Sequence, residues 1–201
     1  STAKLLGAAN TLRFQVRGLT VSMRGYNTDG HGLLNAVKEG FGFQPRGKTV
    51  AIIGCGGAGH GAAIQLALSG ARKLVLINRT SSKALAIARR IRRLKLRTTC
   101  GFDPEPCDLA IQATSLGLKA SDPLPLALRE IQKLRPRFFL DMIYRPAETP
   151  MMRLARRAGC RTANGLGMLL HQGAKAFEIW TGRKAPVEVM RRALRKEIYG
   201  K

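Results

Sequence analysis

A glycine-rich stretch carries the clearest chemistry in this sequence. Gly54-Cys55-Gly56-Gly57-Ala58-Gly59 fits the pattern G-x-G-x-x-G and directly follows the apolar run Thr49–Ile53. Between a buried strand and a helix, Gly54 permits a tight turn, Gly56 lets the backbone approach a pyrophosphate, and Gly59 lets the helix pack closely on the sheet. The free N–H groups at the start of that helix then face the phosphates. The pattern therefore predicts a dinucleotide site.

The end of the next strand indicates which dinucleotide. A strand that binds NAD usually ends in an acid that accepts a hydrogen bond from the ribose 2′-hydroxyl. Here the sequence reads Ile77-Asn78-Arg79-Thr80, with no carboxylate nearby. Arg79 can pair with a 2′-phosphate, and such a charge-assisted bond contributes about 1.5–3 kcal/mol, or about 10- to 150-fold preference for NADP over NAD. The alternative interpretation of Arg79 is a solvated loop arginine.

These residues need a parallel sheet to position them. Apolar runs alternate with segments of helical periodicity from Thr49 onward, which is typical of a doubly wound, Rossmann-type α/β sheet. We expect strands at 49–53, 73–78, 96–100, 109–114, 138–144 and 161–163, and helices at 59–69, 81–94, 125–134, 149–158, 168–180 and 186–197. Upstream, residues 11–26 predict two short strands, residues 27–30 are typical of a turn, and residues 31–39 predict a short helix.

Length and composition exclude several classes of protein. A chain of 201 residues with 45% hydrophobic and 23% charged residues is typical of a globular protein, not a disordered one. No apolar run approaches the ~18 residues that a membrane span needs, and no secretory leader opens the chain. The four cysteines form no Cys-x-x-Cys pair and the three histidines are scattered, so no metal site is predicted. We therefore expect a cytoplasmic protein without a membrane partner.

The net charge of +23 has two interpretations. The densest run, Lys83–Arg97, holds seven basic residues and no acid, as a surface that binds nucleic-acid phosphates would. Apolar residues recur at helical spacing within the same run, which favours the solvated face of a packed helix. No recognisable nucleic-acid-binding motif accompanies the charge, so we expect no specific nucleic-acid partner. A positive field would also attract anionic substrates and cofactors.

Seven segments together resemble the shikimate dehydrogenase family. They are Gly7–Thr11, Gly25–Gly30, Gly54–Gly59, Asn78–Thr80, Ala113–Gly117, Asp141–Tyr144 and Gly165–Met168 with Gln172. They occur in the family's order and approximate spacing from about residue 5 to residue 182. The resemblance implies that the chain interconverts 3-dehydroshikimate and shikimate with NADP(H), in the biosynthesis of aromatic amino acids.

The resemblance also implies roles for individual residues. Asn10 and Asp29 would hold substrate hydroxyls, with Asp29 also one half of the catalytic pair, and Tyr144 and Gln172 would contact the substrate from the other side. The cofactor-binding residues would be Gly54, Gly56, Gly57, Ala58, Gly59, Asn78, Arg79, Thr80, Thr114, Met142 and Gly165. Without the resemblance, Asp29 is by default a turn-former and Gln172 equally a core polar residue.

The implied architecture is an NADP-binding domain beside a remnant of a second, substrate-binding lobe. Residues 43–165 would form the Rossmann domain, residues 1–42 the end of the substrate lobe with a connecting helix, and residues 166–201 helices that return toward that lobe. The family's catalytic lysine lies before the Gly-Ala-x-Asn-Thr motif, and Lys4 is too close to Asn10 to be that lysine. Because losing acid–base help costs ~10²–10⁴-fold in rate, we expect NADPH binding with little turnover by this chain alone.

Three alternatives stay open at this point. The chain could be a non-catalytic NADP-binding module, a quinate/shikimate dehydrogenase-like protein, or, third, a basic nucleic-acid-binding protein. Gln112 and His60 depart from the family pattern near the expected cofactor, where Asn and Arg are more usual. Apolar surface on residues 11–26 makes a homodimer, or association with the missing lobe, an open question.

Overall fold

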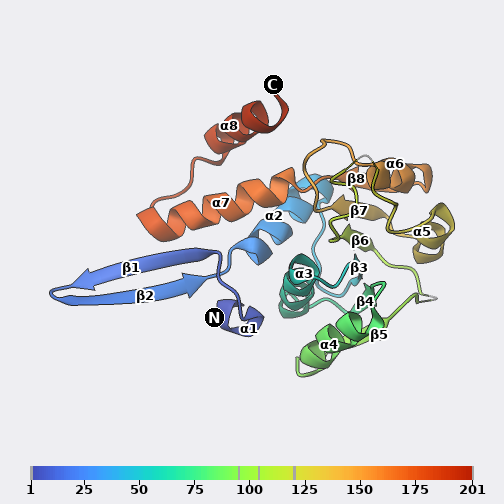
Figure 1. Ribbon diagram of the computed structural model, residues 1–201, viewed down its shortest axis with the longest axis horizontal. Helices are drawn as coiled ribbons and strands as arrows, with labels where there is room; N and C mark the ends of the chain where they lie inside the picture. Colours follow the sequence, from blue (N-terminus) through green and yellow to red (C-terminus); the bar gives the residue numbers. More distant parts are fainter. Residues whose placement is uncertain (1, 95, 104, 120, 201) are drawn as a thin grey trace.

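A six-stranded parallel sheet forms the centre of the molecule, in the order β5-β4-β3-β6-β7-β8 (Figure 1). The computed structural model describes residues 2–94, 96–103, 105–119 and 121–200, so that Lys95 of the basic run lies outside the described residues. This strand order runs outward from the centre in both directions and confirms the predicted doubly wound α/β class. The strands are β3 (Thr49–Ile53), β4 (Lys73–Ile77), β5 (Arg97–Cys100), β6 (Leu109–Gln112), β7 (Phe138–Asp141) and β8 (Arg161–Ala163).

Helices cover both faces of this sheet because its strands are apolar on both sides. Successive side chains of a strand point to opposite faces. Val50 and Ile52 of β3 therefore join the core under one set of helices, and Ala51 and Ile53 join the core under the other. The first set is α2 (Asp29–Phe41), α3 (Gly57–Leu68) and α4 (Ser81–Arg92), and the second is α5 (Leu128–Leu134) and α6 (Pro150–Arg157). Burial on both faces explains the unbroken apolar runs of the central strands.

Several elements begin or end at other residues than predicted. The segment expected to be a turn, residues 27–30, instead starts α2, with Thr28 as its N-cap. Gly40 lies inside that helix, which ends at Phe41 and is followed by Gly42 in the left-handed conformation (φ 66°). Strands β6 and β7 end two and three residues earlier than expected, because the following residues leave the sheet. A short N-terminal helix, α1 (Thr2–Leu6), was not predicted.

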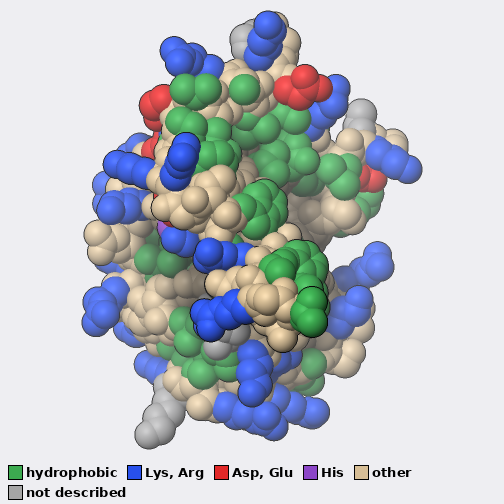
Figure 2. All heavy atoms as spheres, turned by 90° about the vertical axis from the view of Figure 1, so that its left-hand side faces the viewer, with side chains coloured by type: hydrophobic (Ala, Val, Ile, Leu, Met, Phe, Trp, Pro, Cys, Tyr) green, Lys and Arg blue, Asp and Glu red, His purple; other side chains and the backbone are tan. Residues whose placement is uncertain are grey.

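An antiparallel hairpin projects away from the sheet (Figure 1). Its strands are β1 (Thr11–Arg17) and β2 (Thr20–Tyr26), and its turn passes through Gly18 at φ 57°. Apolar side chains share one face of the ribbon and are exposed there: Leu12, Phe14, Val16, Val21 and Met23. Seen from the hairpin side, apolar side chains are uncovered among Lys and Arg side chains that are spread over the whole face (Figure 2).

Two C-terminal helices complete the chain. Helix α7 (Leu166–Thr181) packs along α2, and α8 (Val187–Tyr199) packs on α7. Near the end of α7, the indole N–H of Trp180 donates a hydrogen bond to the carbonyl of Leu12 (2.9 Å), which attaches the hairpin to this helix. In the described part of the chain, no helix combines the length and the apolar character that a membrane crossing requires.

Candidate active site

Two cavities open at the edge of the sheet where the parallel strands end. The first, here called the outer cavity, has a volume of about 560 Å³ and lies at the ends of β3, β4 and β6. The second, here called the cleft, has a volume of about 570 Å³ and lies between the start of α3, the start of α2 and helix α7. In open α/β sheets, ligands bind at this edge, where the strand order reverses. Here the reversal lies between β3 and β6.

The glycine corner between β3 and α3 closes only because its residues lack side chains. Gly54 has φ +100°, and a Cβ there would lie 2.6 Å from Cγ2 of Thr114. A Cβ on Gly59 would overlap the carbonyl oxygen of Gly54. These contacts give both glycines the turn and packing roles that the motif predicts. By contrast, a Cβ on Gly56 or Gly57 would meet no atom within 4 Å, so the backbone there is open to a ligand.

Asn78 connects this corner to the end of β4. Its Oδ1 accepts a hydrogen bond from the Cys55 N–H (2.9 Å), and its Nδ2 donates to the carbonyl of Thr80 (2.9 Å). The neighbouring Arg79 is exposed and lines the outer cavity together with Lys83. Glu130 is the one acidic residue among the described residues that line this cavity. Its carboxylate accepts a hydrogen bond from the N–H of Ala127, at the start of α5. The cavity therefore presents two cations against one hydrogen-bonded carboxylate and favours an anionic ligand.

A hydrogen-bond network brings three of the predicted substrate residues, Asn10, Asp29 and Gln172, together in the cleft. Nδ2 of Asn10 donates to Oδ1 of Asp29 (2.8 Å). Oδ1 of Asn10 accepts from the N–H and the hydroxyl of Thr28 (3.0 and 3.1 Å), and that hydroxyl lies 3.3 Å from Oε1 of Gln172. Thr28, buried and at the N-cap of α2, was missed by sequence reasoning. The sequence feature that could have identified Thr28 is its place within the Asn-Thr-Asp-Gly motif, directly before Asp29.

The opposite wall of the cleft is built where β7 and β8 end. Asp141, the last residue of β7, is fully buried, and its carboxylate accepts hydrogen bonds from the Ile143 N–H (3.0 Å) and the Thr149 hydroxyl (2.6 Å). Burial raises the pKa of Asp141. A Cβ on Gly165 would overlap the carbonyl of Met142, so the two backbones can touch only with glycine there. These contacts fix the backbone next to Tyr144.

Three further side chains near the corner have defined chemical states. His60 lines the cleft, and burial, with a smaller effect from the Arg90 charge, lowers its pKa, so the imidazole is neutral at pH 7. Burial raises the pKa of Cys55 to about 11, which keeps that thiol protonated. Gln112 is buried and shapes the following loop, since its Nε2 donates to the Leu116 carbonyl (2.9 Å) and its Oε1 accepts the Thr114 N–H.

The structure distributes the predicted site residues over the two cavities. The cleft is lined by Asn10, Asp29, Gly57, Ala58, Met142, Tyr144, Gly165 and Gln172. The outer cavity is lined by Gly54, Asn78, Arg79, Thr80 and Thr114. Gly56 lies at the start of α3, and Gly59 is packed beneath the corner. Among the described residues that line the cleft, none is a lysine.

Comparison with family models places two segments of the chain. Residues 36–103 match the model described as shikimate / quinate 5-dehydrogenase, and residues 165–195 match the model of the shikimate 5'-dehydrogenase C-terminal domain. Together these segments contain the glycine corner, Asn78–Thr80 and Gln172.

Individual relatives match nearly the whole chain. The NADP(+) shikimate dehydrogenase of Desulforamulus reducens is 41% identical, over 98% of this chain and 69% of the relative. A crystal structure of a shikimate dehydrogenase in complex with NADP+ superposes with a TM-score of 0.83 at 32% identity, over 98% of this chain and 69% of that chain. The ligand-free 5-ketofructose reductase of a Gluconobacter strain superposes with a TM-score of 0.82 at 33% identity, over 98% and 71%.

Proposed function

The chain belongs to the shikimate dehydrogenase family, and on that basis we propose that it binds NADP(H) across its two cavities and interconverts 3-dehydroshikimate and shikimate in the cleft. One observation supports this most directly. The two cavities share the glycine corner, since Gly54 lines the outer cavity whereas Gly57 and Ala58 line the cleft. A dinucleotide that crosses the corner would have its adenosine end beside Arg79 and its nicotinamide end beside Met142.

The residues at the corner fit a phosphorylated dinucleotide. The first N–H groups of α3 receive no side-chain cap within the described residues, and the backbone at Gly56 and Gly57 is open. Such amides bind a pyrophosphate. Arg79, with Thr80 beside it, would bind the 2′-phosphate, and the absence of a carboxylate after β4 removes the group that selects NAD.

The cleft offers the substrate a carboxylate and several hydrogen-bonding groups. When bound, the cofactor supplies or accepts the hydride. Asp29, held by the Asn10 amide, would take the proton of the substrate hydroxyl during oxidation and return it during reduction. Gln172, which meets Asn10 through Thr28, and Tyr144 on the opposite wall would orient the ring from two sides. Neutral His60 adds a hydrogen-bonding group without a charge.

The cofactor assignment is tested by Arg79→Ala. Titration of NADPH and NADH fluorescence should show a preference for NADPH of about 10- to 150-fold in the wild-type chain, and this preference should disappear in the variant. Arg157→Ala removes an exposed cation from α6 and serves as the matched control. An unchanged preference in Arg79→Ala would refute the 2′-phosphate assignment.

The catalytic assignment is tested by Asp29→Asn. Shikimate-dependent reduction of NADP+, followed at 340 nm, should fall ~10²-fold or more relative to the wild-type rate, with NADPH affinity unchanged. Equal rates in the two proteins would show that Asp29 is not the proton-transfer group. The wild-type rate itself should be small, because none of the described residues that line the cleft is a lysine. NADPH binding without any shikimate binding would favour the non-catalytic NADP-binding module.

A further inference from the structure

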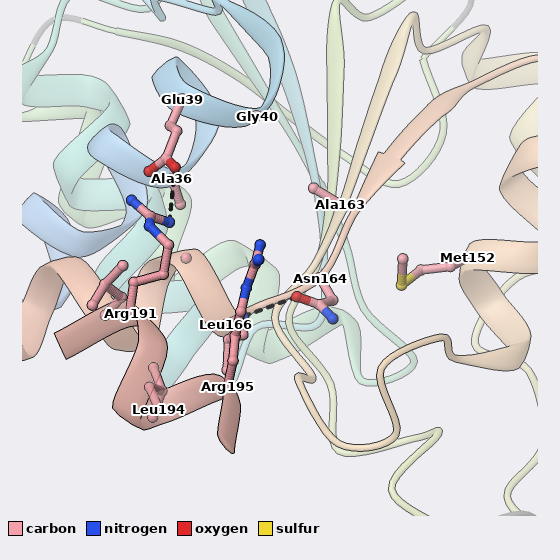
Figure 3. A pocket seen from close by; sticks show the side chains of 12 residues that line it. Ala36, Glu39, Gly40, Met152, Ala163, Asn164, Leu166, Arg191, Leu194 and Arg195 are labelled. Atoms are coloured by element: carbon pink, nitrogen blue, oxygen red, sulfur yellow. Dashed lines mark hydrogen bonds and ion pairs between the residues drawn. The ribbon is translucent and has the colours of Figure 1, made fainter. Parts of the chain in front are cut away.

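Helix α8 is held to the rest of the protein by a half-buried apolar stripe, which includes Met190 and Leu194, and by polar contacts. None of its described residues is buried. A cavity of about 360 Å³ lies between α8, β8, the start of α7 and the end of α2 (Figure 3). On one side of this cavity, Arg191 forms an ion pair with Glu39 of α2 (2.8 Å). Because none of its described residues is fully buried, such polar contacts add to a shallow apolar packing in positioning this helix.

The last residue of α8 makes the second polar contact, and it reaches the wall of the cleft. The Tyr199 hydroxyl donates a hydrogen bond to the backbone carbonyl of Tyr144 (2.6 Å). The same hydroxyl accepts a hydrogen bond from Nδ2 of Asn164 (2.9 Å), which also donates to the Ala147 carbonyl (2.8 Å). One hydroxyl thus connects the segment after β7 with the residue after β8.

We propose that Tyr199 is a positioning residue for the cleft, because its hydroxyl holds the backbone of Tyr144 and, through Asn164, the turn that carries Gly165. The proposal concerns the substrate side of the cleft and rests on the proposed function. Tyr199 itself is not among the residues that line the cleft, so it acts through its neighbours.

The backbone geometry explains why this hydrogen bond matters. Strand β7 ends at Asp141, so the Tyr144 carbonyl lies beyond the sheet ladder. The Tyr199 hydroxyl supplies a partner there, and the position of the Tyr144 backbone determines where its side chain enters the cleft. Burial raises the pKa of the Tyr199 hydroxyl, so it stays protonated and able to donate.

The contact can be observed directly by fluorine NMR. The chain has three tyrosines, so labelling with 3-fluorotyrosine gives three resonances, which Tyr26→Phe and Tyr144→Phe assign. In Tyr199→Phe, which keeps the ring and removes only the hydroxyl, we expect the Tyr144 resonance to shift and the Tyr26 resonance to stay. A merely structural role in α8 would leave Tyr144 unmoved, and that result would overturn the proposal.

Ligand affinity supplies a second readout. Losing one neutral hydrogen bond should weaken shikimate binding to the NADP+-saturated protein by about 2- to 13-fold, with NADPH affinity unchanged. Tyr26→Phe removes a hydroxyl from another tyrosine and should change neither affinity. An equal loss of both affinities in Tyr199→Phe would indicate general loosening and overturn the proposal. If the wild-type chain binds no shikimate, the proposed substrate is wrong, and the fluorine shift still decides whether Tyr199 positions Tyr144.

Discussion

The six-stranded sheet carries the cofactor half of the site, and the β1–β2 hairpin carries part of the substrate half. The two elements differ in how deeply their residues are buried. Strands β3 and β4 are buried at every residue, whereas in β1 only Thr11 is buried and in β2 none of the described residues is. The glycine corner therefore grows out of a core that is packed on both faces. Asn10 stands at the base of a ribbon whose apolar face is exposed, with Phe14 at 61% and Met23 at 64%. The cofactor half is thus independent of the hairpin, while the substrate half depends on how the hairpin is held.

The test with the largest expected effect compares a buried residue of the sheet with an exposed residue of the hairpin. Ile111 in β6 is fully buried, so Ile111→Ala should lower the free energy of unfolding by about 2–5 kcal/mol. Phe14→Ala removes a larger side chain from the hairpin, yet should change that free energy by less than about 0.5 kcal/mol. Urea denaturation measures both. Comparable losses would mean that the hairpin face is covered in solution, and sedimentation would then show whether a second copy covers it.

A second test uses a buried ion pair of the sheet region. Nζ of Lys73 lies 2.7 Å from Oδ2 of Asp103, with side chains only 7% and 5% exposed. The hydrogen bond from Lys73 lowers the pKa of Asp103 from 3.8 to about 2. Because the folded pKa is the lower one, the pair stabilises the fold above about pH 4, and this stabilisation is lost as the pH falls toward 2.

Asp103→Asn should therefore cost about 2–3 kcal/mol of unfolding free energy at pH 7, below the usual loss for a broken buried pair because Glu105 remains 3.4 Å from Lys73. At pH 2 the variant and the wild type should have similar stability. Glu188→Gln, whose carboxylate is 78% exposed beside Arg191, is the control and should cost less than about 0.5 kcal/mol. A pH-independent difference for Asp103→Asn would contradict the assignment.

The smallest expected effect concerns Thr28, which joins the base of the hairpin to helix α7. Thr28→Val keeps the shape of the side chain but removes the hydroxyl that meets Asn10 and Gln172. We expect a loss of about 1 kcal/mol in unfolding free energy and weaker shikimate binding, with NADPH affinity unchanged. Calorimetric titration with each ligand measures this difference. A matching loss of NADPH affinity would show that the two halves of the site are coupled more tightly than their burial suggests.

The sequence predicted the sheet more reliably than the walls of the cleft. Residues 49–53 are apolar and bounded by a charged residue and a glycine, so both ends of β3 were predictable. The predicted ranges of strands β6 and β7 were too long, because apolar residues continue past the ends of both strands. Their ladders end where side chains of Gln112 and Asp141 bond the backbone ahead, which no periodicity reveals.

Contacts between distant segments explain the remaining differences. Residues 27–30 have turn composition, but Thr28 and Asp29 equally suit a helix N-terminus, and the contact with Gln172 on α7 belongs to the helical arrangement. Tyr199 and Tyr144 lie 55 residues apart with no local pattern that joins them. Motifs thus indicated which residues meet in the cleft, whereas the residues that support them became visible only in three dimensions.

The hydrogen bond between Trp180 and the Leu12 carbonyl makes tryptophan fluorescence sensitive to the position of the hairpin. The chain has a single tryptophan, so its tryptophan emission originates entirely at the joint between α7 and the hairpin. A displacement of the hairpin that breaks this hydrogen bond changes the surroundings of the indole and hence its emission wavelength. The substrate side can thus be followed in real time without a label.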